Sequence, residues 1–251
     1  MNLRRFAPGS STARVNHRLR ILLQASAVGA AGAGALLSAS VGHASAAPTG
    51  IDSNGCADVE VVFSRGTFED PGVGKVGTAF VDALRDRLPG RDIAVYAVDY
   101  PATMDFARAV DGVADVADHL NDMAARCPTT DIVLGGYSQG AAVSAYATSD
   151  TVPVGYPLPA GLSEPLSPAV AENVAAVALF GKPSPAVVNL LQHAAPPIIV
   201  GSAFVGKTIE LCAPEDPVCQ FGSVNRAAHS AYTTNGMAEQ AADFAAAQVT
   251  A

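Results

Sequence analysis

The chain has 251 residues, with 15 Lys or Arg against 23 Asp or Glu, so its formal charge is −8 at pH 7. A chain this acidic lacks the cationic surface that attracts the phosphates of nucleic acid, so nucleic acid is excluded as an expected partner. Hydrophobic residues make up 49% of the chain, which is enough for one sizeable core.

The first 46 residues have the pattern of an export signal. They contain five arginines and no acidic residue, then an apolar run from Ile21 to Val41, and they end in Ala44-Ser45-Ala46. We expect cleavage after Ala46, which changes the formal charge to −13 because five arginines leave with the signal, and we expect a secreted, extracellular protein. The alternative is an uncleaved anchor, since about 20 apolar residues can span a bilayer.

Residues 47–251 alternate β-rich and helical segments. Strands are predicted at 57–64, 93–98, 132–135, 174–180 and 208–211, and helices at 73–88, 105–126, 141–147 and 236–249. Strands separated by helices pair in parallel, and nearly continuous apolar strands are covered on both faces. The pattern predicts one α/β domain of three layers, with about five parallel strands and helices on both faces.

Two segments interrupt this alternation. Prolines between Pro153 and Pro168 predict a surface loop. The segment from Pro183 to Gly206 is rich in Val, Leu and Ile, and we expect it to pack in the core; the alternative is an apolar rim on a substrate cleft. Four aspartates on one face of the 105–126 helix predict a solvated surface, and no ligands converge on them that would predict a metal site.

All four cysteines lie in the part of the chain that we expect to be exported. An even number of cysteines in an oxidising compartment indicates two disulfides, for which three pairings are possible. The short separation of Cys212 and Cys219 favours a local loop, which leaves Cys56 to pair with Cys127. A zinc site would need closer C-x2-4-C pairs than this chain has.

A nucleophile motif lies in the middle of the chain. Gly136-Tyr137-Ser138-Gln139-Gly140 follows the apolar strand at 132–135 and opens an alanine-rich helix. In a G-x-S-x-G turn between a strand and a helix, the serine hydroxyl is held clear of the backbone beside a base, with glycines relieving the crowding. Ser138 is therefore the candidate nucleophile.

When a serine nucleophile lies in a parallel sheet of this type, the acid and then the histidine follow it in the chain. His229 follows all the predicted strands and precedes the last helix, so we favour it as the base over His193; His119 precedes the serine and is expected on the surface. Asp216 is the favoured acid because two prolines and the Cys212–Cys219 pair would fix its loop, and Glu215 is the alternative.

Together these motifs resemble the cutinase family, and within it the cutinase-like serine esterases of mycobacteria. The resemblance begins near Cys56 and includes 63–67, 96–102, the G-x-S-x-G turn, 178–181, the C-x3-D-x2-C loop and His229-Ser230-Ala231-Tyr232. It implies an α/β-hydrolase-type fold, a triad of Ser138, His229 and Asp216, and the same two disulfides.

The resemblance also implies an oxyanion hole made by Thr67 and Gln139, without a metal or cofactor. Fungal cutinases place aliphatic residues where this chain has Ser223 and Asn225, whereas Met104 matches an apolar lip position. These expected substrate contacts predict a less apolar cleft and soluble or modestly long acyl esters.

The expected function is hydrolysis of carboxylic esters, whether fatty acyl, lipid or polyester, through an acyl-enzyme. The alternatives are a carbohydrate acetyl esterase or an acyltransferase on the same fold, or a catalytically silent surface or binding protein. We expect a monomer that binds an ester or lipid substrate and makes transient contact with a lipid or cell-envelope surface.

Overall fold

The computed structural model describes residues 55–152 and 164–249. The predicted signal peptide, its cleavage site and most of the proline-rich loop lie outside the described residues. Within the described ranges, no helix combines the length and apolar character needed to cross a membrane.

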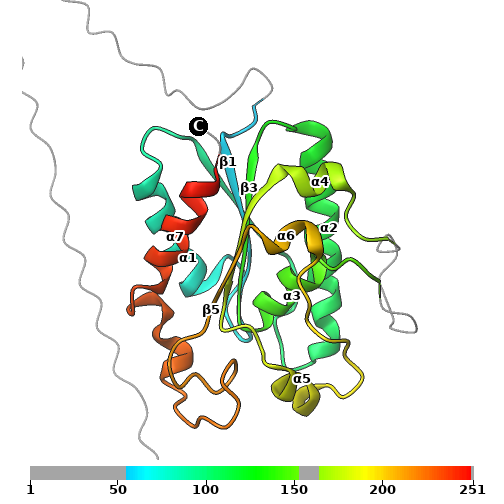
Figure 1. The fold of residues 1–251 in the computed structure, drawn as a ribbon, viewed down its shortest axis with the longest axis vertical. Helices are drawn as coiled ribbons and strands as arrows, with labels where there is room; N and C mark the ends of the chain where they lie inside the picture. Colours follow the sequence, from blue (N-terminus) through cyan, green and yellow to red (C-terminus); the bar gives the residue numbers. More distant parts are fainter. Residues whose placement is uncertain (1–54, 153–163, 250–251) are drawn as a thin grey trace, which may run out of the picture. The chain divides into compact units, whose positions relative to one another are not determined.

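A parallel sheet of five strands forms the centre of the molecule (Figure 1). The strands are β1 (Val59–Ser64), β2 (Ile93–Ala97), β3 (Asp131–Tyr137), β4 (Val174–Phe180) and β5 (Thr208–Leu211). Their order is β2-β1-β3-β4-β5, and every neighbouring pair is parallel. The predicted fold class is confirmed, and β4 and β5 have the predicted bounds.

Helices cover both faces of the sheet, as expected. The α-helices are α1 (Gly74–Arg87), α2 (Ala109–Arg126), α3 (Gln139–Ala147), α4 (Pro168–Asn173), α5 (Pro185–Leu191), α6 (Ser202–Val205) and α7 (Met237–Gln248). Two 3₁₀ helices are η1 (Phe106–Arg108) and η2 (Ala228–Thr233). In Figure 1, α1 and α7 pack together on one face, whereas α2 and α3 lie on the other.

The short helices α4 and α5 were not predicted, although each carries a start signal. Ser167 accepts a hydrogen bond from the Val170 N–H and Ser184 accepts one from the Val187 N–H, and a proline occupies the first turn of both helices. A serine followed by proline is a typical helix start. Because each helix has only six or seven residues, its hydrophobic period is too short to be recognised.

Two apolar clusters fill the space between the sheet and its helices. On the α1 and α7 face, the rings of Phe63, Phe80 and Phe180 lie 5.7 to 6.3 Å apart. On the other face, Leu134 and Val143 belong to a cluster that joins β3, α2 and α3. This burial on both faces explains why the strands read as nearly continuous apolar runs.

The two predicted disulfides are present. Cys56 pairs with Cys127 and Cys212 pairs with Cys219, with Cα atoms 5.7 and 5.9 Å apart. The first bond joins the segment before β1 to the end of α2 across 71 residues. Closing a loop of that length stabilises the fold by about 4 kcal/mol in the chain-entropy model.

His119 was predicted to lie on the surface, but its side chain is only 11% exposed. Its Nε2 is 2.9 Å from the Glu60 carboxylate, and its ring stacks on Tyr96 with centroids 3.5 Å apart. Burial is the main reason that the pKa of Tyr96 rises to about 12, and its hydroxyl donates to Asp115. The prediction failed because the acidic character of the helix did not reveal that His119 faces Glu60 and Tyr96 of neighbouring strands. Among the described residues, no three potential metal ligands cluster.

Candidate active site

Ser138 occupies a strained turn between β3 and α3. Its φ of 56° lies in the left-handed region, which a residue other than glycine adopts at an energetic cost. A Cβ at Gly140 would lie 1.9 Å from the Ser64 carbonyl oxygen, and one at Gly136 would lie 2.3 Å from the Gly140 carbonyl oxygen. Both glycines are therefore required for the strand and helix to meet this closely.

Ser138, His229 and Asp216 form one hydrogen-bonded chain. The Ser138 Oγ is 2.9 Å from the His229 Nε2, and the His229 Nδ1 is 2.9 Å from the Asp216 Oδ2. Ser138 follows the central strand β3, Asp216 lies in the loop after β5, and His229 lies in η2. Residues separated by up to 91 positions thus converge at the carboxyl edge of the sheet.

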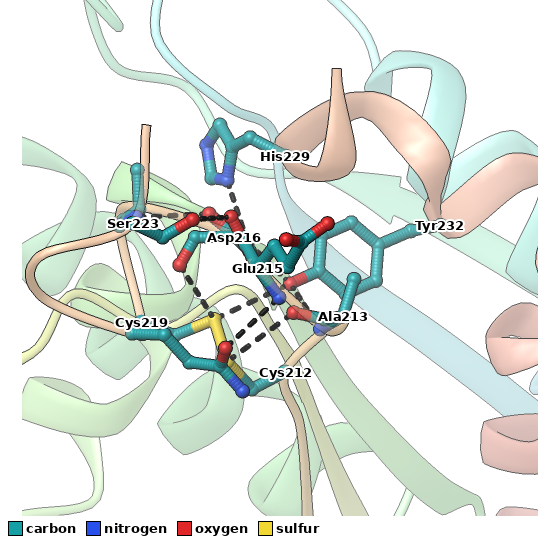
Figure 2. Close-up of a disulfide and its surroundings, with 10 residues drawn as sticks. Cys212, Ala213, Glu215, Asp216, Cys219, Ser223, His229 and Tyr232 are labelled. Atoms are coloured by element: carbon teal, nitrogen blue, oxygen red, sulfur yellow. Dashed lines mark hydrogen bonds and ion pairs between the residues drawn. A yellow bond between two sulfur atoms is a disulfide. The ribbon is translucent and has the colours of Figure 1, made fainter. Parts of the chain in front are cut away.

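Asp216 is fully buried and receives three hydrogen bonds (Figure 2). Besides His229, the Tyr232 hydroxyl donates to Oδ2 at 2.5 Å and the Val218 N–H donates to Oδ1 at 2.9 Å. Burial raises the pKa of Asp216, but the hydrogen bonds from His229, Tyr232 and Val218 together outweigh burial and hold the pKa below its usual value. The carboxylate is therefore charged at neutral pH.

Two tyrosines that sequence reasoning did not assign support this arrangement. Tyr232 donates to Asp216 and accepts from the Ala213 N–H at 3.0 Å. Tyr137 stacks on the His229 ring with centroids 5.0 Å apart, and its hydroxyl donates to the His229 carbonyl at 2.5 Å. Burial raises the pKa of both phenols, so both act as neutral donors. The position of Tyr232 three residues after His229 was the available signal.

Gly181 leaves the space in which these side chains meet. It follows β4 with a φ of 57°, and a Cβ there would lie 3.0 to 3.1 Å from the Tyr232 hydroxyl, Asp216 Oδ2 and His229 Cε1. Its conformation favours glycine, and its three neighbours would have to shift to admit a Cβ. In the sequence, this glycine stood out only as part of the motif at 178–181.

The two residues expected to form an oxyanion hole, Thr67 and Gln139, line the same cavity as Ser138. Gln139 is the first residue of α3, so its backbone N–H has no partner within the helix. The Gln139 side chain donates to the Thr103 carbonyl at 3.1 Å, which ties the loop before η1 to the elbow.

Arg65 fixes the turn that carries Thr67. Its guanidinium is buried, and it donates to the carbonyl oxygens of Glu69, Val98 and Tyr100 at 3.0, 3.2 and 2.5 Å. The Glu69 carboxylate in turn accepts from the Gly66 N–H at 2.7 Å. Because the guanidinium donates in several directions at once, it joins the segments after β1 and β2 into one rigid support.

A cavity of about 660 Å³ extends from Ser138. Its apolar wall includes residues of η1, α2, α3, α5 and the segment after α5: Phe106, Ala109, Val110, Val113, Ala142, Tyr146, Ala147, Val187, Val188, Leu191, Pro196, Pro197, Ile198 and Ile199. Most of the wall opposite α3 comes from the segment between Pro183 and Gly206. The prediction that this segment packs in the core is confirmed for the buried Phe204 and for Ile198 and Val200, which pack against the core cluster. It was wrong for Val187, Val188, Leu191 and Ile199, which form an apolar rim on the cavity, as the alternative had it.

The three expected substrate contacts are not among the residues that line this cavity. Met104 is 55% exposed. The Ser223 hydroxyl donates to the Glu215 carbonyl, and the Asn225 amide donates to the Glu215 carboxylate at 3.2 Å. The expectation of a less apolar cleft depended on Ser223 and Asn225, so it does not apply to this cavity. The resemblance to cutinases placed the two residues on the loop before His229 but could not show which way their side chains turn.

The alternatives for base and acid also have definite positions. His193 is exposed after α5, in the segment opposite α3. The Glu215 carboxylate accepts a hydrogen bond from the Asn225 amide. Asp216, in contrast, faces His229 (Figure 2). Glu215 also has a φ of 65°, which turns the backbone of this disulfide-closed loop.

Comparison with known proteins identifies the family of this chain. The family model described as "Cutinase" matches residues 55–249. "Probable carboxylesterase Culp5" of Mycobacterium tuberculosis is 48% identical over 176 residues, which cover 70% of this chain and 98% of that relative.

Two solved structures from Trichoderma reesei share the fold. Its cutinase, in complex with a phosphonate inhibitor, is 29% identical with a TM-score of 0.57 and covers 78% of each chain. The catalytic core of its acetyl xylan esterase is 25% identical with a TM-score of 0.61, over 77% of this chain and 99% of that one. Because the family model spans every described residue, the chain belongs to the cutinase family of carboxylic ester hydrolases.

Proposed function

We propose that this protein is a secreted serine esterase in which Ser138 is the nucleophile, His229 is the general base and acid, and Asp216 orients His229. The observation that carries the proposal is the hydrogen-bonded chain from Ser138 through His229 to a buried, charged Asp216, beside an apolar cavity. A free serine is a weak nucleophile, and such a chain activates it.

In the first half of the reaction, the Ser138 Oγ attacks the ester carbonyl carbon while its proton passes to the His229 Nε2. The tetrahedral intermediate then releases the alcohol, which leaves with that proton, and the acyl group remains on Ser138. In the second half, water attacks the acyl-enzyme and gives its proton to His229, and the carboxylic acid leaves as the proton returns to Ser138. Asp216 stabilises the imidazolium in both halves without taking a proton.

The negative charge that develops on the carbonyl oxygen needs donors fixed in advance. We assign this role to the backbone N–H of Gln139 and to Thr67. Arg65 and Glu69 support the second position through the contacts described above. Losing one such donor typically lowers kcat by about 10² to 10³. This mechanism uses only side chains and backbone groups of the chain itself.

Export and surface contact form part of the same proposal. Two disulfides fit an oxidising compartment, and residues 1–46 have the pattern of a signal peptide. Large apolar side chains are exposed in the loops after β1 and β2 and in α5, namely Phe68, Met104 and Leu190. We assign to them transient contact between a monomeric enzyme and a lipid or cell-envelope surface.

The test compares wild type with Ser138→Ala on p-nitrophenyl butyrate. We expect the substitution to abolish turnover while the thermal unfolding midpoint stays within a few degrees, because it removes only one partly exposed hydroxyl and its hydrogen bond to His229. Covalent labelling by a serine-directed phosphonate should occur in wild type and disappear in the variant. His193→Ala is the matched control and should retain full activity. Undiminished turnover in Ser138→Ala would disprove the assignment, and a wild type that is neither active nor labelled would favour a silent binding protein.

A further inference from the structure

We propose that the acyl chain of the substrate, roughly ten carbons long, lies along α3 in the cavity that starts at Ser138, and not between Met104 and the loop at 223–225. The inference rests on the proposed role of Ser138 as nucleophile. It identifies the substrates as medium-chain acyl esters, and it attributes the limit on chain length to particular positions on α3.

The spacing of the cavity residues gives the direction of the cavity. Ser138, Ala142 and Tyr146 all line it, and they recur at intervals of four residues along α3. Residues at these intervals lie above one another on one face of a helix. The cavity therefore runs parallel to the axis of α3 and begins at the nucleophile.

The wall that α5 contributes is apolar, and its side chains are not buried in the core. Val187, Val188 and Leu191 of α5 line the cavity at helical spacing, and none of the residues of α5 is buried. The Tyr146 hydroxyl donates to the Pro196 carbonyl at 2.5 Å, which fixes the segment after α5 to α3. An acyl chain between these walls would remove apolar surface of both from water, which is favourable.

The length of α3 sets the length of the chain. Its nine residues rise about 13 Å at 1.5 Å per residue. A carbon–carbon bond is about 1.5 Å long, and an extended acyl chain lengthens by somewhat less than this for each carbon. About ten carbons therefore reach from Ser138 to the end of α3. Each buried methylene should raise kcat/KM up to about fourfold until this limit is reached.

An acetyl group or a sugar ring would use this cavity poorly. An acetyl group has one methyl to bury, so a cavity of about 660 Å³ would stay almost empty of substrate. A sugar bound along the apolar wall would place hydroxyls against Val, Leu, Ile and Pro side chains, which offer no hydrogen bonds. Polar side chains such as Asp150, Glu164 and Gln192 also line the cavity, but they are fewer than the apolar ones. These walls favour fatty acyl esters over acetylated carbohydrate.

The experiment places a leucine at two depths along α3. Ala142 lies four residues beyond Ser138, about 6 Å along the axis, and Ala147 lies nine residues beyond it, about 13 Å. Rates are measured on p-nitrophenyl esters from acetate to palmitate with wild type, Ala142→Leu and Ala147→Leu. Ala125→Leu is the matched control, because Ala125 is an exposed alanine of α2 that is not among the cavity residues. Phosphonate titration of Ser138 normalises each rate to folded enzyme.

We expect wild type to peak near decanoate. Ala142→Leu should lower the decanoate-to-acetate ratio of kcat/KM about 100-fold or more. Ala147→Leu should leave the hexanoate-to-acetate ratio close to that of wild type and lower the dodecanoate-to-hexanoate ratio about tenfold. The control should keep the wild-type profile. If Ala142→Leu fails to fold, Val188→Phe fills the cavity from α5, and a reduced decanoate-to-acetate ratio is expected there too.

Unchanged ratios in the folded cavity variants would overturn this inference while leaving Ser138-dependent ester hydrolysis intact. A wild-type peak at acetate would also overturn it and favour the acetyl esterase alternative. If wild type hydrolyses none of these esters in a Ser138-dependent way, the proposed function itself is overturned.

Discussion

Replacing Tyr232 with phenylalanine tests how the acid of the site is held. The change removes one hydroxyl and keeps a ring whose centroid lies 5.7 Å from that of Tyr137 and 6.0 Å from that of Phe180. The hydroxyl donates to the buried Asp216 carboxylate and accepts from the Ala213 N–H. The variant therefore loses a hydrogen bond to a charge and leaves a buried N–H without its acceptor.

The expected loss of stability is about 3 kcal/mol, since a hydrogen bond to a charged group contributes about 1.5 to 3 kcal/mol and an orphaned buried donor adds to the cost. For a domain of this size, that corresponds to a fall in Tm of roughly 6 to 12 °C. We also expect kcat to fall about tenfold with little change in KM, because Asp216 would orient His229 less well while the acyl cavity is untouched.

The pH dependence distinguishes this role from simple packing. Hydrogen bonds hold the pKa of Asp216 below its usual value, so its charge contributes stability that is present above the unfolded pKa and is lost as pH falls through the folded pKa. Removing the Tyr232 hydroxyl raises the folded pKa, so the difference in stability between variant and wild type should shrink as pH falls below about 4.

Tm values measured from pH 7 down to pH 3, with kcat and KM on p-nitrophenyl butyrate at pH 7, provide the test. Tyr137→Phe is the control, because its hydroxyl donates to a neutral backbone carbonyl, and its stability loss should show no such trend. An unchanged kcat together with a pH-independent loss in Tyr232→Phe would refute the reasoning.

Two further predictions concern the supports of the site. Replacing Cys212 and Cys219 with serine should lower the temperature at which activity is lost by more than it lowers the Tm followed by far-UV circular dichroism. The reason is that the disulfide closes a short loop around Asp216, where it contributes about 2 to 3 kcal/mol in the chain-entropy model. Equal shifts of the two temperatures would contradict this. Arg65→Lys should lower kcat on p-nitrophenyl butyrate about 100-fold and change KM much less. An ammonium cannot reach three carbonyl oxygens in a fixed plane, so the turn that carries Thr67 would lose its support. A kcat within threefold of wild type would remove Thr67 from the proposed oxyanion hole.

The sheet and its long helices could be predicted because their signals are local. A run such as Val174–Phe180 is apolar at nearly every position, and the helix before β3 has a clear hydrophobic period, so chain order and parallel pairing follow. The boundary of that helix was four residues early, since η1 shares its apolar spacing but has tighter turns.

The site could be predicted only in part, for a physical reason. Motif order identifies Ser138, Asp216 and His229 because each follows a strand or precedes a helix at a fixed point of the chain. The direction of a loop side chain depends on contacts that the sequence does not display. Ser223 turns to the Glu215 backbone, and several apolar residues between 187 and 199 turn to a cavity, where the Tyr146 hydroxyl donates to the Pro196 carbonyl.

The position of the candidate residues in the sheet has a consequence for inactivation. Ser138 follows β3, which is paired on both sides, whereas Asp216 follows β5, a strand of four residues with a single neighbour at the edge of the sheet. Edge elements open locally at a lower free-energy cost than central ones. Under gentle heating, the acid and the base should therefore separate from an intact nucleophile elbow, and the enzyme should become reversibly inactive while most of its sheet is still folded.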